Sequence, residues 1–154
     1  MPLDPDTILS LERQAVEGHF LTQWGTTTAV QMMNVPEIDK ADNTGRAINW
    51  CWFRVEWGEE RQESIGASNP RFRANGLATC VIYVPRDTGR DTMNLLASKA
   101  ARILRAPDLT VGSESDCQIT FDRNVQIESE VEEGSWLQQV IRGFFTTQRR
   151  YTSL

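Results

Sequence analysis

The stretch that decides the fold is Leu77-Ala78-Thr79-Cys80-Val81-Ile82-Tyr83-Val84-Pro85-Arg86-Asp87-Thr88-Gly89-Arg90-Asp91. Its first eight residues are rich in β-branched and aromatic side chains, which is typical of a strand, and Pro85 ends the hydrogen-bond ladder. Thr88 and Asp91 have capping-box spacing, which predicts that a helix begins here. Apolar residues then recur on one helical face, at Met93, Leu96, Ala97, Ala100, Ile103 and Leu104.

Working outward, the same signals predict the remaining elements. A first helix, capped by Asp4 or Asp6, should run to about Trp24. Strands are predicted at Ala29 to Met33, at Trp50 to Trp57 and at Trp136 to Thr147. Cys117 to Phe121 and Val125 to Glu128 are predicted to form either a hairpin or one bent strand.

Polar, turn-prone segments separate these elements. We expect mobile loops near residues 34–49 and 58–75, and a flexible C-terminal tail at 148–154. The end of the second loop, Arg71-Phe72-Arg73, can instead extend the third strand.

The order of the elements predicts an α+β fold in one domain spanning residues 1–154. We expect a mostly antiparallel or mixed β-sheet with two α-helices packed on one face and long polar loops between strands. In the strand Trp50 to Trp57, Cys51 and Phe53 share one face while Trp52 and Arg54 share the other. A sheet face without helices would be a place where another chain packs.

Composition excludes several classes of protein. No apolar run approaches the roughly 20 residues of a membrane helix, so we expect a soluble chain with no membrane partner. The net charge of −5 disfavours a protein that wraps nucleic acid. Three widely spaced cysteines, Cys51, Cys80 and Cys117, favour buried, reduced thiols over disulfides or a metal site.

The sequence predicts no catalytic residue, no metal and no cofactor. His19 is the only histidine, and there is no glycine-rich phosphate loop, CxxC, HExxH or GxSxG motif. The acidic run from Glu128 to Glu133 resembles paired catalytic carboxylates or a cation site, but acids beside Gly134 are more typical of a solvated turn.

The tryptophans leave three interpretations open: sheet core, subunit interface, or a stacking platform for a sugar. For the interface we single out aromatic and basic residues, because both types are enriched where subunits meet. They are Trp50, Trp52, Arg54, Arg71, Phe72, Arg73, Arg86 and Arg90.

Over nearly its whole length the chain resembles the tail terminator proteins of tailed bacteriophages, also called tail completion or minor tail proteins. The likeness is one of pattern. It rests on the opening helix, a strand ending near Asn34-Val35-Pro36, the aromatic strand from Trp50, the strand, turn and helix from Gly76 to Leu104, and Glu133-Gly134-Ser135-Trp136 ahead of the last strand.

The resemblance implies a structural virion protein, assembled in the host cytoplasm, that forms a homo-oligomeric ring, typically a hexamer. Such a ring caps the tail tube, stops its polymerisation and joins it to the head-completion, stopper or connector protein of the neck. DNA would only pass through the lumen. An acidic ring face or lumen would repel phosphates, and the candidates for it are Glu59, Glu60, Glu128, Glu130, Glu132 and Glu133.

Two alternatives remain. A head-completion or stopper ring of the same phage neck would also lack catalytic groups. In a different class, the chain would be a carbohydrate-binding or small-ligand-binding domain, using Trp50, Trp52 and the acidic run.

Overall fold

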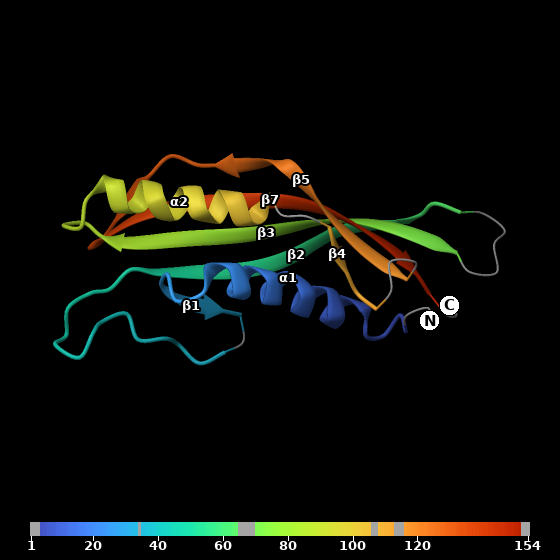
Figure 1. Ribbon diagram of the computed structural model, residues 1–154, viewed down its shortest axis with the longest axis horizontal. Helices are drawn as coiled ribbons and strands as arrows, with labels where there is room; N and C mark the ends of the chain where they lie inside the picture. The colour runs from blue at the N-terminus through green and yellow to red at the C-terminus, as the bar shows by residue number, and fades with distance from the viewer. Residues whose placement is uncertain (1–3, 34, 65–69, 106–107, 113–115, 152–154) are drawn as a thin grey trace.

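A computed structural model describes residues 4–33, 35–64, 70–105, 108–112 and 116–151. Two helices, α1 (Ile8–Trp24) and α2 (Arg90–Leu104), accompany a sheet that runs along an elongated molecule (Figure 1). The strands are β1 (Ala29–Met32), β2 (Trp50–Gln62), β3 (Arg71–Pro85), β4 (Leu109–Thr110), β5 (Cys117–Ile127), β6 (Val131–Glu133) and β7 (Trp136–Arg150).

The sheet is mixed, which confirms the α+β class predicted from the sequence. Its strand order is β1-β2-β3-β7-β5-β4, and β6 pairs with the start of β7. Only β1 and β2 are parallel, and the other pairs are antiparallel. The long central pair runs in unbroken register from Arg71 opposite Arg150 to Pro85 opposite Trp136.

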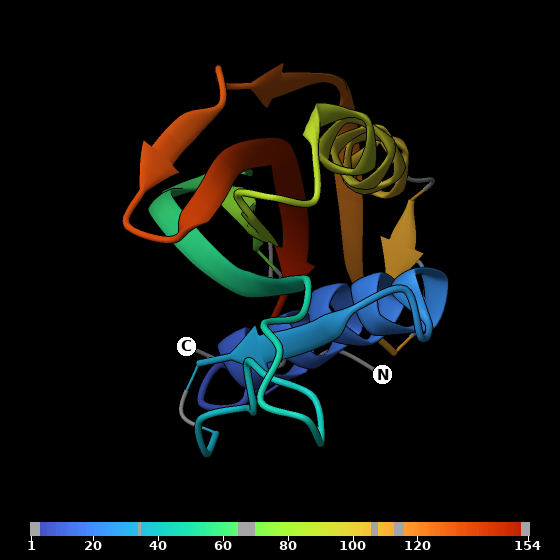
Figure 2. The ribbon, with the colours of Figure 1, turned by 90° about the vertical axis from the view of Figure 1, so that its left-hand side faces the viewer.

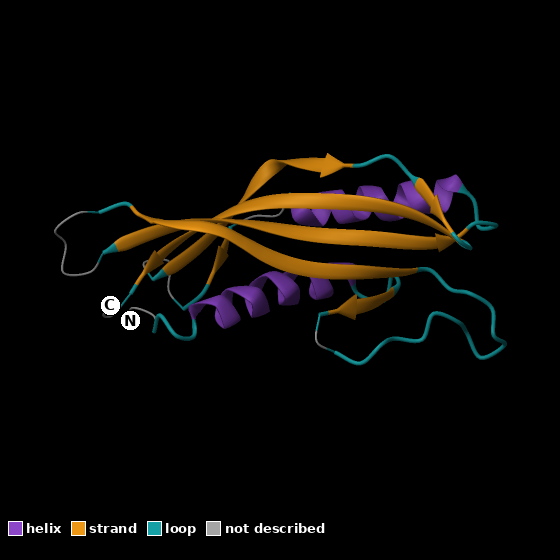
Figure 3. Cartoon of the chain, turned by 180° about the vertical axis from the view of Figure 1, so that it is seen from behind, coloured by secondary structure: helices purple, strands orange, loops and turns teal. Residues whose placement is uncertain are grey.

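The sheet is strongly curled, as the view along the molecule shows (Figure 2). The register shifts twice, between Trp57 and Glu60 in β2 and between Phe121 and Val125 in β5. Extra residues of this kind increase local twist and bend the strand that carries them. Beyond the first shift, β2 and β3 continue as an arm that extends past the helices (Figure 3); we call residues 58–64 with 70–76 the β2–β3 arm.

One face of the long strands lies in the core, and we call it the core face. In β2 it presents Cys51, Phe53 and Val55, and in β3 Ala78, Cys80, Ile82 and Val84, all 3% exposed or less. Phe20 of α1 stacks on Phe53 with ring centroids 4.1 Å apart. Leu104 of α2 packs directly against Gly143. A Cβ at position 143 would lie 2.8 Å from the Cβ of Leu104, so a larger residue would not fit there. The opposite side of the strands, which presents Trp52 and Arg54, is called the outer face.

The predicted helix caps are wrong. α2 begins after Gly89, whose φ of 95° lies in the left-handed region, and no side chain caps the helix. Thr88 is instead the last residue of a turn in which its amide donates to the carbonyl of Pro85. At α1 the cap residue is Thr7, again without a capping side chain, and Asp4 accepts from the amide of Asp6. In both places a tight turn precedes the helix.

β2, β3 and β7 are longer than predicted, and the polar segments at 58–75 and 148–154 are shorter. β2 continues to Gln62 and β3 begins at Arg71, so most of the expected loop at 58–75 is antiparallel hairpin; residues 65–69 lie outside the described part. The suggestion that Arg71 extends the third strand is confirmed. β7 continues to Arg150, so the expected tail at 148–154 begins as strand, and residues 152–154 again lie outside the described part. The two short segments predicted from 117 to 128 form one bent strand.

The expected loop at 34–49 contains a turn of its own. Ala41 and Ala47 form an antiparallel bridge. Between them, the Asp42 carboxylate accepts the backbone N–H groups of Thr44 and Arg46 at 2.8 and 3.0 Å. Among the described residues, no helix is both long and apolar enough to cross a membrane.

Candidate interaction surface

Three aromatic rings from adjacent strands pack together on the outer face. Trp50 stacks on Tyr83 with centroids 4.2 Å apart, and Trp136 meets Trp50 edge to face at 6.1 Å. The ammonium of Lys40 lies 4.6 Å from the centre of the Trp50 ring. Trp50 is therefore only 8% exposed. Because its ring is covered by Tyr83 and Lys40, it offers no free flat face for a sugar to stack on.

The next residues along β2 are more open. The Arg54 guanidinium lies 4.9 Å from the centre of the Trp52 ring, and both side chains are half-buried. They flank Val81 and Thr79, their register partners in β3, which are buried on this same face. Arg54 also pairs with Glu56 at 3.3 Å. Trp52 and Arg54 thus form a preformed strip of an aromatic ring and a guanidinium on the outer face, which we call the Trp52–Arg54 strip. Such residues are the ones enriched at energetically dominant contacts between proteins.

The structure does not bring all the predicted interface residues to one surface. Phe72 lies on the core face, with its ring 5.1 Å from that of Tyr151. Arg71 and Arg73 lie on the outer face of the β2–β3 arm, where Arg73 pairs with Glu63 at 2.9 Å. Arg86 and Arg90 follow the far end of β3.

Most of the carboxylates predicted to form an acidic face are paired with arginines. Arg86 binds Glu132 at 2.7 Å, Arg90 lies 3.5 Å from Glu130, and Arg142 pairs with Glu128. In β2, Glu59 accepts from Arg61 at 3.0 Å, which lowers the pKa of that carboxyl. Glu133 forms no ion pair with a described residue, and its charge adds to the burial that raises the pKa of Tyr83. No three histidine, cysteine or acidic side chains within the described ranges are placed to hold a metal ion.

The sequence reasoning missed a buried charge network beneath α1. The carboxylate of Glu12, which is 0% exposed, accepts Nε and Nη2 of Arg149 at 2.7 and 2.6 Å. Trp57 donates to the same carboxylate at 3.0 Å. The Glu60 carboxylate completes the network by accepting from Arg149 and, at 2.7 Å, from the hydroxyl of Tyr151. Glu60 is therefore engaged inside the subunit.

A signal for this network was present in the sequence. Glu12 lies at the helical spacing of the buried residues Ile8 and Val16, so it interrupts an apolar stripe with a charge. Arg149 falls in the same alternation as Phe145 and Thr147, both of which face the core. A charge at a core position of a helix, and an opposite charge at a core position of a strand, predict a buried pair.

The three cysteines are not placed as activated nucleophiles. The thiol of Cys117 lies 3.4 Å from Oε1 of Glu12, and burial together with that negative charge raises its pKa far above the ordinary value. Burial also raises the pKa of Cys80, and all three cysteines are free and buried. A thiol that stays protonated is a poor nucleophile. The His19 ring has no hydrogen-bond partner at its buried Nε2 among the described residues.

Comparison with known proteins adds evidence for the fold alone. No protein-family model and no curated protein sequence matches the chain. Among solved structures, 16 chains match. One of them, which carries no functional name, covers 90% of this chain and 94% of its own length with a TM-score of 0.59 and 12% identity. A similar fold therefore occurs in another chain of similar length.

Proposed function

We propose that this protein is a tail terminator subunit of a tailed bacteriophage, acting as a ring that caps the tail tube and joins it to the neck. In this role the chain works by shape and self-association and breaks no bond. The proposed partners are further copies of the chain, the tail tube protein, and a head-completion, stopper or connector protein.

The observation that carries the proposal is the Trp52–Arg54 strip. We infer that both helices pack on the core face, because Phe20 of α1 rests on Phe53 and Leu104 of α2 rests at Gly143, both core-face positions. The part of the outer face that is not already buried, including the half-buried Trp52 and Arg54, is then left for other chains. A tryptophan held half-buried by a stacked arginine loses little side-chain freedom on binding, which favours its use as an interface anchor.

The two edges of the sheet support assembly into a ring. β1 forms one edge and β4 with β5 the other, and β4 pairs only with residues 118–119 of β5. Because the two edges differ in sequence and in length, a contact between copies that uses both is heterologous. A heterologous contact closes into a ring when the rotation between copies allows it, and the ring then has two different faces. Termination follows if only one of those faces matches the tube.

The proposed lumen depends on charge. Since Glu128, Glu130 and Glu132 are paired with arginines, the repulsion of DNA has to come from the net charge of −5 and from carboxylates that remain free. DNA would then pass without specific binding.

The test has two measurements on the purified protein. The first is the mass of the assembly in solution by native mass spectrometry, for which we expect a closed oligomer. The second is polymerisation of the tail tube protein of the virus that encodes this chain, for which we expect shorter tubes with the protein bound at one end. Tubes of unchanged length in the presence of an assembled ring would contradict the proposal. Binding to the connector without binding to the tube would favour a stopper ring.

A further inference from the structure

The solvent side of α1 carries no charge at its exposed positions. Opposite the buried residues of this helix, the exposed ones are Leu9, Ser10, Gln14, Gly18, Leu21, Thr22 and Gln23. Leu9 and Leu21 are 48% and 42% exposed. The solvent side of α2, by contrast, carries Arg90, Asp91 and Arg102. Charged residues are depleted at the centre of contacts between proteins, so the solvent side of α1 is typical of a helix that another chain covers.

Gly18 lies in the middle of this surface, where the subunit itself has no use for a glycine. Glycine is among the least favourable residues inside a helix. No described atom lies within 4 Å of a Cβ placed at position 18, and Gly18 is not among the glycines with a positive φ. A glycine on a helix surface allows a backbone or a large side chain to come close. Its presence therefore indicates close approach by a second chain.

Contacts inside the subunit fix which strand residues lie level with this surface. Phe20 of α1 stacks on Phe53 of β2, and Glu12 accepts a hydrogen bond from Trp57. The eight helical residues between these contacts span about 12 Å, and the four strand residues span about 13 Å. Helix and strand therefore run in opposite directions and cover the same length of the molecule.

On this scale Gly18 lies level with Arg54, and Leu21 lies close to the level of Trp52. Within one subunit the two surfaces point away from each other, because the Trp52–Arg54 strip is on the outer face and α1 packs against the core face. A rotation about an axis parallel to the long strands keeps every residue at its own level along that axis. In a ring with such an axis, the strip of one copy meets the α1 of the next copy at Gly18 and Leu21.

Charges match at the same level. Glu17, beside Gly18, forms no ion pair with a described residue. Arg54 pairs with Glu56 at 3.3 Å, but a guanidinium has five N–H donors, so this pair leaves donors of Arg54 unused. Glu17 of the next copy would supply the acceptor that Arg54 lacks.

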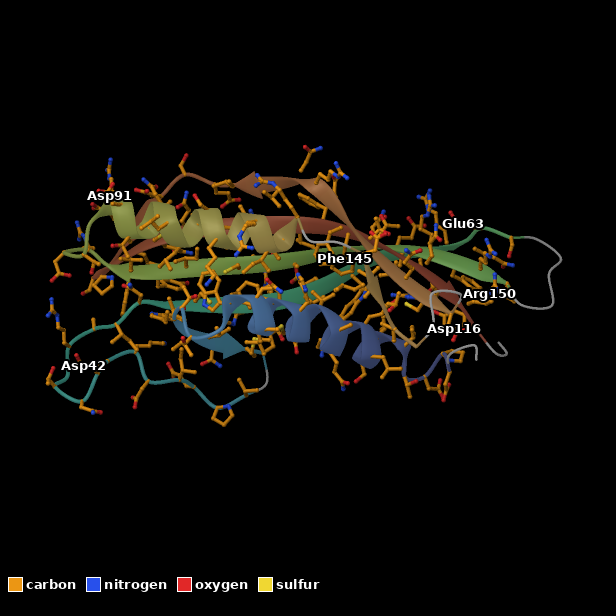
Figure 4. All side chains as sticks on the ribbon, viewed as in Figure 1. Asp42, Glu63, Asp91, Asp116, Phe145 and Arg150 are labelled. Atoms are coloured by element: carbon orange, nitrogen blue, oxygen red, sulfur yellow. The ribbon has the colours of Figure 1, made fainter. Side chains whose placement is uncertain are left out.

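A second match lies at the end of the molecule where α1 begins (Figure 1), which is also where Arg150 lies (Figure 4). Arg71 and Arg150 are directly opposite each other in β3 and β7, and neither forms an ion pair with a described residue. Like charges at such positions destabilise a sheet unless opposite charges compensate them. Asp4 and Asp6, ahead of α1, are exposed and likewise without an ion pair to a described residue. The same rotation brings these carboxylates to the level of the two arginines.

We propose that the Trp52–Arg54 strip of one copy of this chain packs against the solvent side of α1 in the next copy, with closest approach at Gly18 and an ion pair between Arg54 and Glu17. The two surfaces differ, so the contact is heterologous and repeats around a ring whose axis is parallel to the long strands. Each sheet then has helices on both faces. The inference rests on the proposed ring function, and it names the contact that joins neighbouring subunits.

A long side chain at position 18 tests the close approach on the full-length protein. Gly18→Gln should leave the subunit at least as resistant to urea as the wild type, measured below the concentration at which it assembles, because glutamine favours a helix and meets no described atom. It should nevertheless weaken self-association at least tenfold in analytical ultracentrifugation. The matched control is Ser98→Gln, at an exposed position of α2, which should assemble like the wild type.

Charge exchange tests the ion pair between copies. Arg54→Glu and Glu17→Arg should each weaken self-association at least tenfold, because like charges then face each other. An equimolar mixture of the two variants should assemble again, since each variant then meets a neighbour of opposite charge on both sides. Native mass spectrometry should find equal numbers of both variants in the mixed assembly. Circular dichroism verifies that every variant is folded.

The inference is overturned if Gly18→Gln assembles normally, if the mixture of charge variants fails to assemble, or if Ser98→Gln loses assembly as well. In each of these cases a wild-type ring that caps tubes leaves the proposed function intact, with a different contact between subunits. A wild type that stays monomeric at all concentrations overturns both. A ring that shows the expected variant effects but does not cap tubes removes only the proposed function.

Discussion

The guanidinium of Arg149 donates two hydrogen bonds to the carboxylate of Glu12, which lies 137 positions earlier in the sequence. Nε lies 2.7 Å from Oε1, and Nη2 lies 2.6 Å from Oε2. The pair ties the last strand to the first helix. Both side chains are nearly inaccessible, at 4% and 0% exposure. A buried ion pair has little net value against an apolar replacement, but breaking it leaves one charge buried without compensation.

The first prediction follows from this asymmetry. Replacement of Arg149 by Met should lower the free energy of unfolding by about 3–5 kcal/mol, because the Glu12 carboxylate stays buried. The double replacement Glu12→Leu with Arg149→Met should recover much of that loss. Urea denaturation measures both. The half-exposed pair of Arg142 and Glu128 provides the control, and Arg142→Met should cost no more than about 1 kcal/mol. If Arg149→Met also lowers the free energy of unfolding by no more than about 1 kcal/mol, the Glu12–Arg149 pair is not a buried pair of charges.

The second prediction concerns alkaline pH. Burial, followed by the hydrogen bond to Glu60, raises the pKa of Tyr151 from 10.0 to about 12. Since the folded state favours the neutral phenol, this contribution to stability is fully present below about pH 10 and is lost as the pH rises from 10 to 12. It amounts to at most roughly 3 kcal/mol, at about 1.4 kcal/mol per pKa unit.

Tyrosinate absorbance measures this directly, because the chain has only two tyrosines. We expect Tyr151 to ionise well above pH 10 in the native protein. A Tyr151→Phe variant, followed by urea denaturation across the same range, should lose less stability between pH 10 and 12 than the wild type. Ionisation of Tyr151 near pH 10 in the folded protein would show that its hydroxyl is not held as described.

The third prediction concerns a close approach between strands. A Cβ at Gly76 would lie 2.1 Å from Cε2 and Cζ of Phe145, which is itself buried. Gly76→Ala should therefore destabilise the protein by about 1–3 kcal/mol, and by less in a Phe145→Leu background, where the ring is absent. Gly18 is the matched control, because a Cβ there meets nothing within 4 Å. Since Gly18 lies inside α1, Gly18→Ala should stabilise by roughly 0.5–1 kcal/mol. Equal effects at the two glycines would refute the close packing.

The fourth prediction separates the tryptophans of β2. Trp52→Ala should weaken self-association or tube binding at least tenfold and change the free energy of unfolding little, because its ring is half-buried on the outer face. Trp50→Ala should instead destabilise the subunit by about 3 kcal/mol or more, since Trp50 is 8% exposed and stacked on Tyr83. Analytical ultracentrifugation and thermal melting measure the two effects. The Trp52–Arg54 strip is not an interface if Trp52→Ala lowers the stability of the subunit but the fraction of the variant that stays folded assembles normally.

Local patterns in the sequence were sufficient for the elements with strong periodicity. The helix from Met93 to Leu104 and the C-terminal end of the strand around Cys80 were predicted close to their observed bounds, because β-branched runs and a helical apolar stripe are local signals. The alternation in β2 also correctly separated Phe53, in the core, from Trp52, on the outer face. The β2–β3 arm was not predicted, because polar side chains on solvent-facing strands are typical of loops as well.

The amino-acid sequence alone determined the α+β class and the two faces of each long strand, because those depend on the periods of 2 and 3.6 residues that neighbouring side chains impose on each other. Only the tertiary structure decided how charges are used. Glu60 was expected on an acidic surface, and its carboxylate instead accepts from Arg149 and Tyr151. The charges of Arg86 and Glu132, 46 positions apart, proved to be a pair. Whether a charged side chain is buried, paired or free depends on strand register and sheet curvature between distant segments, and no local pattern specifies those.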